Sequence, residues 1–186
     1  MNIVKHFFII LLASLIPYLS SAQKIDSPGN SWGFALNSSY NTEINTVGLV
    51  PGASFYKEKS QFELGVGFYP FVVKNQRVVS GNFNYKYFPN GAGNKFNLFL
   101  IISGAYVNQL RKTYYPATYQ YLFLGGGYGM QISLFKGVYL GTNINLGTFT
   151  HSKRTENPYK NYLGTQKLFD EFGMNLAFQA NVGYRF

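Results

Sequence analysis

The end of the chain restricts its fold more than any other feature: from Phe172 to Phe186, apolar residues alternate with small or polar ones without a break. One face carries only apolar residues: Phe172, Met174, Leu176, Phe178, Ala180, Val182, Tyr184 and Phe186. A period of two places alternate side chains on opposite faces of a β-strand. Strands of soluble proteins usually have about five or six residues. The segment therefore predicts an unusually long strand with one apolar face.

Earlier segments repeat this alternation. The predicted strands are 32–40, 46–56, 61–71, 78–88, 96–107, 119–134, 138–150 and 170–186. Their connections alternate between short turns and longer loops, as in outer-membrane barrels, where an even number of strands also places both ends on the periplasmic side. We predict one all-β domain, residues 23–186, forming a closed, antiparallel, up-and-down transmembrane β-barrel of eight strands. Proline cannot donate to a ladder, so we expect a bulge at Pro51.

The composition indicates which face of the strands meets lipid. Charged residues make up 12% of the chain, whereas a soluble domain has about a quarter. The non-apolar faces are rich in Gly, Ala, Ser and Asn, which suit the narrow interior of a small barrel. Aromatic residues gather near strand ends, as in interfacial girdles: Tyr56, Tyr69, Tyr87, Phe88, Tyr106, Tyr119, Tyr184 and Phe186. These features favour a membrane barrel over a soluble lipocalin-like barrel whose apolar face points inward.

The first 22 residues have the organisation of a secretory signal peptide. Lys5 and His6 precede an apolar stretch, residues 7–16, which is too short to span a membrane and is followed by Pro17. Small residues end the segment and place the mature start at Gln23. We therefore predict cleavage after residue 22 and export to the cell outer membrane. The sequence has no cysteine, which excludes disulfides, a lipid-bearing cysteine and thiol chemistry.

The leader and the aromatic final strand together carry a family resemblance. Phe186 ends the chain, and Tyr184 lies two residues earlier on the same face. The chain thereby resembles the small eight-stranded outer-membrane β-barrels of the OmpA/OmpX type over its whole mature length. The resemblance implies that Tyr184 and Phe186 form a signal for the barrel-assembly machinery, and that outer-membrane lipid and lipopolysaccharide surround the barrel.

The strand faces place a small set of charges in the interior. Glu63, Lys86 and Arg185 all lie on predicted inward faces near the periplasmic end. Because an isolated buried charge is costly, we expect them to pair, with Glu63 binding Lys86 across a hairpin. An eight-stranded barrel is barely wide enough for its own side chains. A small-solute channel is therefore the weakest of the functional alternatives.

The positive charge of the chain, +9, lies mainly in the connections between strands. A nucleic-acid-binding protein would gather these residues on one helix or face, so we expect no nucleic-acid partner. The longest connection, residues 151–169, combines basic and aromatic side chains: Lys153, Arg154, Tyr159, Lys160 and Lys167. These residues either keep the loop soluble or bind a partner. The partner would be the phosphate groups of lipopolysaccharide, or a host or envelope protein.

One group of residues invites a comparison with enzymes. His151, Ser152 and Glu156 are the residue types used by the lipid A deacylase family, whose fold this chain resembles. In that family one residue separates the His from the Ser, whereas here they are adjacent and would lie on opposite faces of a strand. We therefore predict no catalytic, cofactor or metal site and a non-enzymatic surface or interaction protein, with a lipid A-modifying enzyme built on His151 as the alternative.

Overall fold

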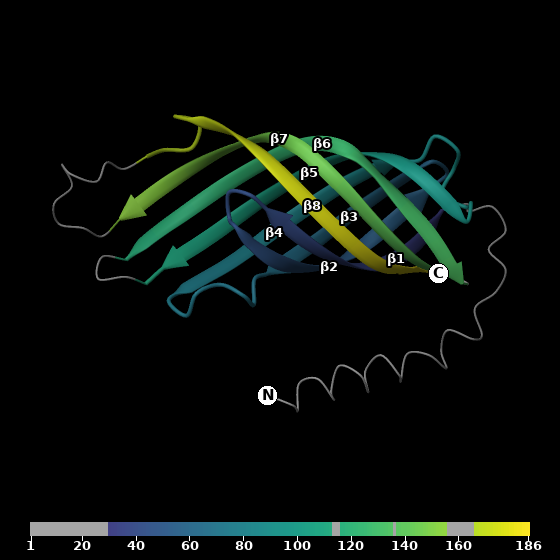
Figure 1. Ribbon diagram of the computed structural model, residues 1–186, viewed down its shortest axis with the longest axis horizontal. Coiled ribbons are helices and arrows are strands. Elements are labelled where there is room, and N and C mark those ends of the chain that lie inside the picture. Colours follow the sequence, from purple (N-terminus) through teal and green to yellow (C-terminus); the bar gives the residue numbers. More distant parts are fainter. Residues whose placement is uncertain (1–29, 113–115, 136, 156–165) are drawn as a thin grey trace, which may run out of the picture.

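The structure is a computed structural model that describes residues 30–112, 116–135, 137–155 and 166–186. Its strands, drawn in Figure 1, are β1 (Ser31–Asn41), β2 (Thr46–Lys57), β3 (Ser60–Phe68), β4 (Gln76–Tyr87), β5 (Phe96–Arg111), β6 (Ala117–Phe135), β7 (Val138–Thr155) and β8 (Phe172–Arg185). The predicted signal peptide, residues 1–22, lies outside the described residues.

Each strand pairs antiparallel with the next, and β1 pairs with β8 to close the barrel. Gly33 lies opposite Arg185 in this last pair, and the Phe186 backbone N–H donates to the Trp32 carbonyl oxygen at 3.0 Å. Closure leaves neither edge of the sheet unpaired. The predicted all-β, up-and-down barrel of eight strands is therefore confirmed.

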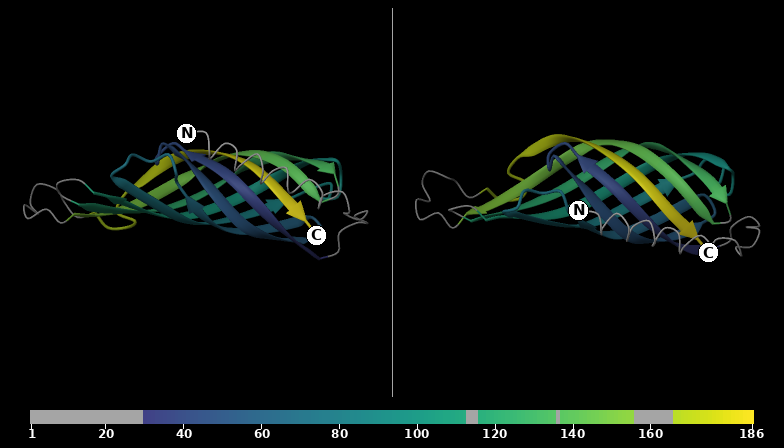
Figure 2. Two further views of the ribbon diagram at one scale, coloured as in Figure 1. Left: turned by 90° about the horizontal axis from the view of Figure 1, so that it is seen from below. Right: turned by 60° about the horizontal axis from the view of Figure 1, so that its bottom comes forward.

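Three strands exceed their predicted length by at least three residues. The strands β5, β6 and β7 contain 16, 19 and 18 residues, whereas β3 has nine. About nine to eleven residues are enough to cross a bilayer as a tilted strand. The extra length lies at the end of the barrel that carries the connections 42–45, 69–75 and 156–171, here called the loop end, where these strands project beyond β1 to β3 (Figures 1 and 2).

The expected bulge at Pro51 is wrong. Leu36 lies opposite Pro51 in an unshifted β1–β2 register, and the β2–β3 register is the same at Leu49 as at Gly52. Proline has no backbone N–H to donate, and the only effect is a gap in the β2–β3 ladder between those two residues. The strand therefore accommodates Pro51 without an inserted residue. The described register shift lies instead in β6, between Ser133 and Phe135.

The outer wall of the barrel is apolar and the inner wall is mostly small or polar. Exposed outward side chains include Trp32, Phe62, Leu64, Leu100, Ile102, Leu124, Leu146, Met174 and Phe178. Aromatic rings meet on the outside near the end where β1 begins and β8 ends, here called the terminal end: Trp32 with Phe55, Phe34 with Phe186, and Tyr184 with Phe186. The apolar face therefore points outward as predicted, and the lipocalin-like alternative is wrong. The expected place of Tyr56, Tyr69 and Phe88 in the outer girdles is also wrong, because their side chains are buried inside the barrel.

Candidate functional site

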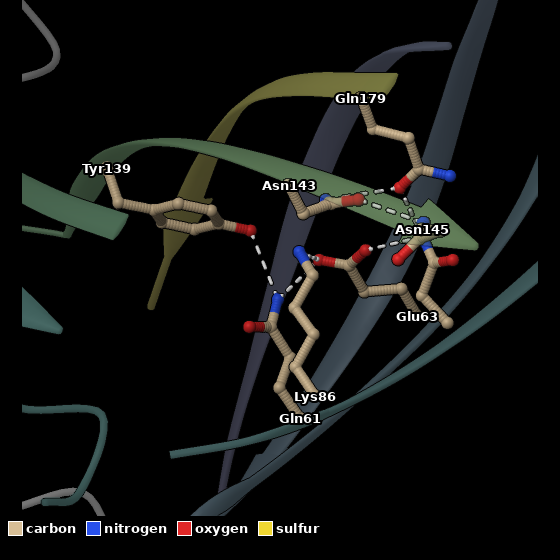
Figure 3. A network of polar contacts seen from close by, with 8 residues as sticks. Gln61, Glu63, Lys86, Tyr139, Asn143, Asn145 and Gln179 are labelled. Atoms are coloured by element: carbon tan, nitrogen blue, oxygen red, sulfur yellow. Dashed lines mark hydrogen bonds and ion pairs between the residues drawn. The ribbon is translucent and has the colours of Figure 1, made fainter. Parts of the chain in front are cut away.

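The barrel interior holds the ion pair expected from the sequence (Figure 3). Lys86 Nζ on β4 lies 2.6 Å from Glu63 Oε1 on β3, and the two side chains are 0% and 3% exposed. Gln61 Nε2 donates to the same carboxylate oxygen at 2.6 Å, and Asn84 Nδ2 donates to the other at 3.2 Å. A buried charge pair is stable only when such additional hydrogen bonds satisfy it. The interior polar network meets that condition.

The hydrogen bonds continue across the lumen to the opposite strands. Gln61 Nε2 donates to the Tyr139 hydroxyl at 3.3 Å, so β3 is tied to β7. On the other side, Asn84 and Asn143 both donate to Gln179 Oε1, at 3.4 and 3.3 Å (Figure 3). The network therefore crosses the barrel interior from wall to wall.

Arg185 is buried near the terminal end as predicted, but it does not join the ion pair. Its guanidinium carbon lies 3.7 Å from the centre of the Tyr56 ring, and Nη1 donates to the Ala92 carbonyl oxygen at 3.1 Å. The aromatic face and the carbonyl take the place of a carboxylate. The turn that supplies Ala92 was not expected to enter the barrel.

Apolar clusters close the lumen on both sides of the polar network. At the terminal end the cluster is Tyr56, Phe88, Ala92, Phe99, Ile101 and Tyr139. Toward the loop end it is Tyr69, Val78, Val107, Tyr121 and Phe123. A cavity of about 40 Å³ lies near this second cluster, lined by Ser39, Asn82 and Gln179 among others. It has room for about three water molecules, since one needs roughly 10 to 15 Å³ of such space.

The projecting parts of β6 and β7 carry a stack of aromatic rings on their inner faces. Tyr119, Tyr121 and Phe123 alternate along β6, with ring centres 6.3 and 5.8 Å apart. The His151 ring on β7 lies 5.5 Å from the Tyr121 ring and nearly parallel to it. Alternate residues of a strand share a face, so β6 presents its rings as a continuous stack.

Two cations meet at the outermost ring of this stack. The Arg111 guanidinium carbon on β5 lies 4.6 Å from the centre of the Tyr119 ring, and Lys153 Nζ on β7 lies 5.8 Å from it. Arg111 Nη2 donates to Gln109 Oε1 at a long 3.5 Å, and its buried Nε has no hydrogen-bond partner among the described residues. The Glu63–Lys86 pair is the one salt bridge in the described part of the chain, so neither cation has a described carboxylate partner.

We call Arg111, Tyr119, Tyr121, His151 and Lys153 the mouth cluster. Of these five residues, only Lys153 was predicted from the sequence to bind anionic groups. Arg111 was missed because β5 was expected to end at residue 107, and Tyr119 was assigned to an interfacial girdle. The continued alternation of Val107, Gln109 and Arg111 was the signal that could have found it.

The other predicted loop residues do not join the mouth cluster in the described structure. Arg154 lies on the opposite face of β7 from Lys153 and is exposed. Lys167 is exposed, and its backbone N–H donates to Asp170 Oδ2 at 2.9 Å. Tyr159 and Lys160 lie outside the described residues.

The residues compared with the deacylase family lie as the strand geometry predicts. His151 faces the interior, whereas the Ser152 hydroxyl is on the outer face and donates to Gln120 Oε1 at 3.2 Å. Glu156 is outside the described residues. The described residues contain no group of three or more His, Cys, Asp or Glu side chains placed to hold a metal ion. Within the same residues, no helix is both long and apolar enough to cross a membrane.

Comparison with solved structures identifies the fold. The N-terminal β-barrel domain of Pseudomonas aeruginosa OprF matches 85% of this chain and 98% of its own, with a TM-score of 0.61 and 11% identity. A major outer membrane protein of Thermus thermophilus matches 86% of this chain and 100% of its own, with a TM-score of 0.53 and 13% identity. No protein-family model and no curated protein matches the sequence. The chain therefore has the eight-stranded barrel fold of these outer-membrane proteins.

Proposed function

We propose that this protein is an integral outer-membrane barrel that acts at the cell surface as a non-enzymatic binding protein for anionic groups. The apolar outer wall supports the location, with the terminal end in the periplasm and the loop end outside. Residues 1–22 act as the signal peptide, and the outward rings of Tyr184 and Phe186 are presented to the barrel-assembly machinery. The packed lumen supports binding at the loop end and argues against a solute channel.

The main support for anion binding is the pair of cations that contact the Tyr119 ring. Arg111 and Lys153 come from strands on either side of β6, and both approach the same ring without a described carboxylate. A buried guanidinium N–H without a partner is costly. An anionic oxygen that accepts a hydrogen bond from Arg111 Nε removes that cost and interacts favourably with both positive charges at the ring. Phosphate, sulfate and carboxylate groups have this chemistry.

Replacing both cations tests the proposal. We expect the Arg111→Gln/Lys153→Gln variant to bind the phosphorylated core oligosaccharide of lipopolysaccharide at least about tenfold more weakly, since each charge-assisted hydrogen bond contributes more than a neutral one. Isothermal titration calorimetry of the detergent-solubilised barrel measures the change. Lys57→Gln/Lys59→Gln is the matched control, because both lysines are exposed at the β2–β3 turn, at the opposite end of the barrel. Equal affinity of the double variant and the wild type would contradict the proposal.

The alternative function, lipid A modification, depends on His151. The outward hydroxyl of Ser152 and the inward ring of His151 argue against a shared catalytic site. We expect no release of fatty acid from lipid A above background, and no difference between the wild type and His151→Ala, when the products are measured by mass spectrometry. Release that disappears on replacing His151 would support the enzyme instead.

A further inference from the structure

A groove of about 600 Å³ crosses the outer wall of the barrel from β2 to β6. Gly81 on β4 and Gly104 on β5 form its floor, because both lie on the outward face of their strands. Its sides are apolar and include Leu64, Val66, Phe83, Tyr106 and Leu122.

The packing of the sheet does not require the two floor glycines. A Cβ added to Gly81 would meet no heavy atom within 4 Å, and one added to Gly104 would meet only ordinary contacts at 3.6 Å or more. At Gly52, by contrast, an added Cβ would collide with the backbone of β3. Neither floor glycine has the left-handed backbone conformation that favours glycine. The groove is therefore space that a larger side chain could have filled.

Positive charge lies at the loop end of the groove. Gly81 pairs with Val66 on β3 and Tyr106 on β5, and the outward face of β4 continues through Val79 to the exposed Arg77. Arg77 lies four positions before Gly81 on the strand, or about 13 Å away at roughly 3.3 Å per residue. The same connection exposes Lys74 beside two apolar side chains, Phe71 and Val73. Arg77 and Lys74 form no salt bridge with any described carboxylate.

We propose that the groove binds a phosphorylated lipid of the outer leaflet, with an acyl chain over Gly81 and Gly104 and a phosphate at Arg77. An apolar groove in the lipid-facing wall is surrounded by acyl chains. The exposed guanidinium distinguishes an anionic lipid from a neutral one, because arginine binds phosphate oxygens in a bidentate manner. Phe71 and Val73 lie beside Lys74 in the connection and enter the interface at the depth of the headgroup. This site lies on the outer wall and is independent of the mouth cluster.

Filling the groove tests the proposal. The detergent-solubilised barrel is titrated with hexa-acylated lipid A, and bound lipid is counted by native mass spectrometry. We expect the wild type to retain lipid A, and Gly81→Leu to bind it at least about tenfold more weakly, because the leucine side chain occupies the space of several methylene groups. Gly126→Leu is the matched control: Gly126 is also outward, its added Cβ meets only Ile101 O at 3.6 Å, and it does not line the groove.

A separate variant tests whether Arg77 binds the lipid phosphate. We expect Arg77→Gln to weaken binding of lipid A about tenfold and to leave binding of chemically dephosphorylated lipid A unchanged. Folding of each variant is checked by its heat-dependent mobility shift on a gel. Equal retention of lipid A by Gly81→Leu and Gly126→Leu would show that the groove does not bind the acyl chain. Equal loss of both lipids in Arg77→Gln would show that Arg77 does not bind the phosphate.

Discussion

Replacing Lys86 with methionine will destabilise the barrel by about 3 to 5 kcal/mol, because Glu63 is then left as a buried charge without its cation. The carboxylate is 3% exposed and keeps only its bonds from two neutral amides, those of Gln61 and Asn84. The measurement is urea unfolding in lipid vesicles, followed by the fluorescence of Trp32. This residue is the one tryptophan of the chain and lies on the outer wall.

Two further variants separate the charge from the loss of side-chain packing. The double variant Glu63→Gln/Lys86→Met removes both charges, so most of the lost stability should return. Lys59→Met changes an exposed lysine in a neighbouring turn and should have little effect. If the double variant is as unstable as Lys86→Met, the defect comes from packing and not from an unpaired charge.

Replacing Gly127 with alanine will impair barrel formation, whereas the same change at the adjacent Gly126 will not. An added Cβ at Gly127 points inward and collides with the Ile144 carbonyl oxygen and approaches Asn145 Cα at 2.9 Å. At Gly126 it points outward, and its nearest heavy atom is 3.6 Å away. A backbone atom cannot rotate away as a side chain can, so β6 and β7 must separate at Gly127. We expect a cost of about 3 kcal/mol, at the upper end of the usual range for overpacking.

The two glycine variants form a matched pair because they differ only in the direction of one methyl group. The yield of heat-modifiable barrel after refolding into detergent measures closure, and urea unfolding measures the stability of the folded fraction. Gly126→Ala should equal or slightly exceed the wild type, since alanine has less backbone entropy to lose than glycine. Equal yields and stabilities for the two variants would show that the β6–β7 spacing is not critical.

The sequence by itself determined the number and order of the strands and which side chains of each strand point outward. The alternation from Phe172 to Phe186 predicts β8 because each residue's face depends only on its position within its own strand. Glu63 and Lys86 were predicted to pair for the same reason: both lie on inward faces of strands joined by a single hairpin. Such features are local in sequence, so periodicity is enough to predict them.

Only the tertiary structure decided how far the strands extend and which side chains meet across the barrel. The end of β5 at Arg111 depends on its pairing with β4 and β6. Arg111 and Lys153 both reach the Tyr119 ring only because β6 lies between their strands. Arg185 was predicted to lie inside, but its contact with Tyr56 on β2 depends on the closure of β8 onto β1. These contacts join residues far apart in the chain. They are therefore determined by strand register and barrel closure, which no single segment of the sequence contains.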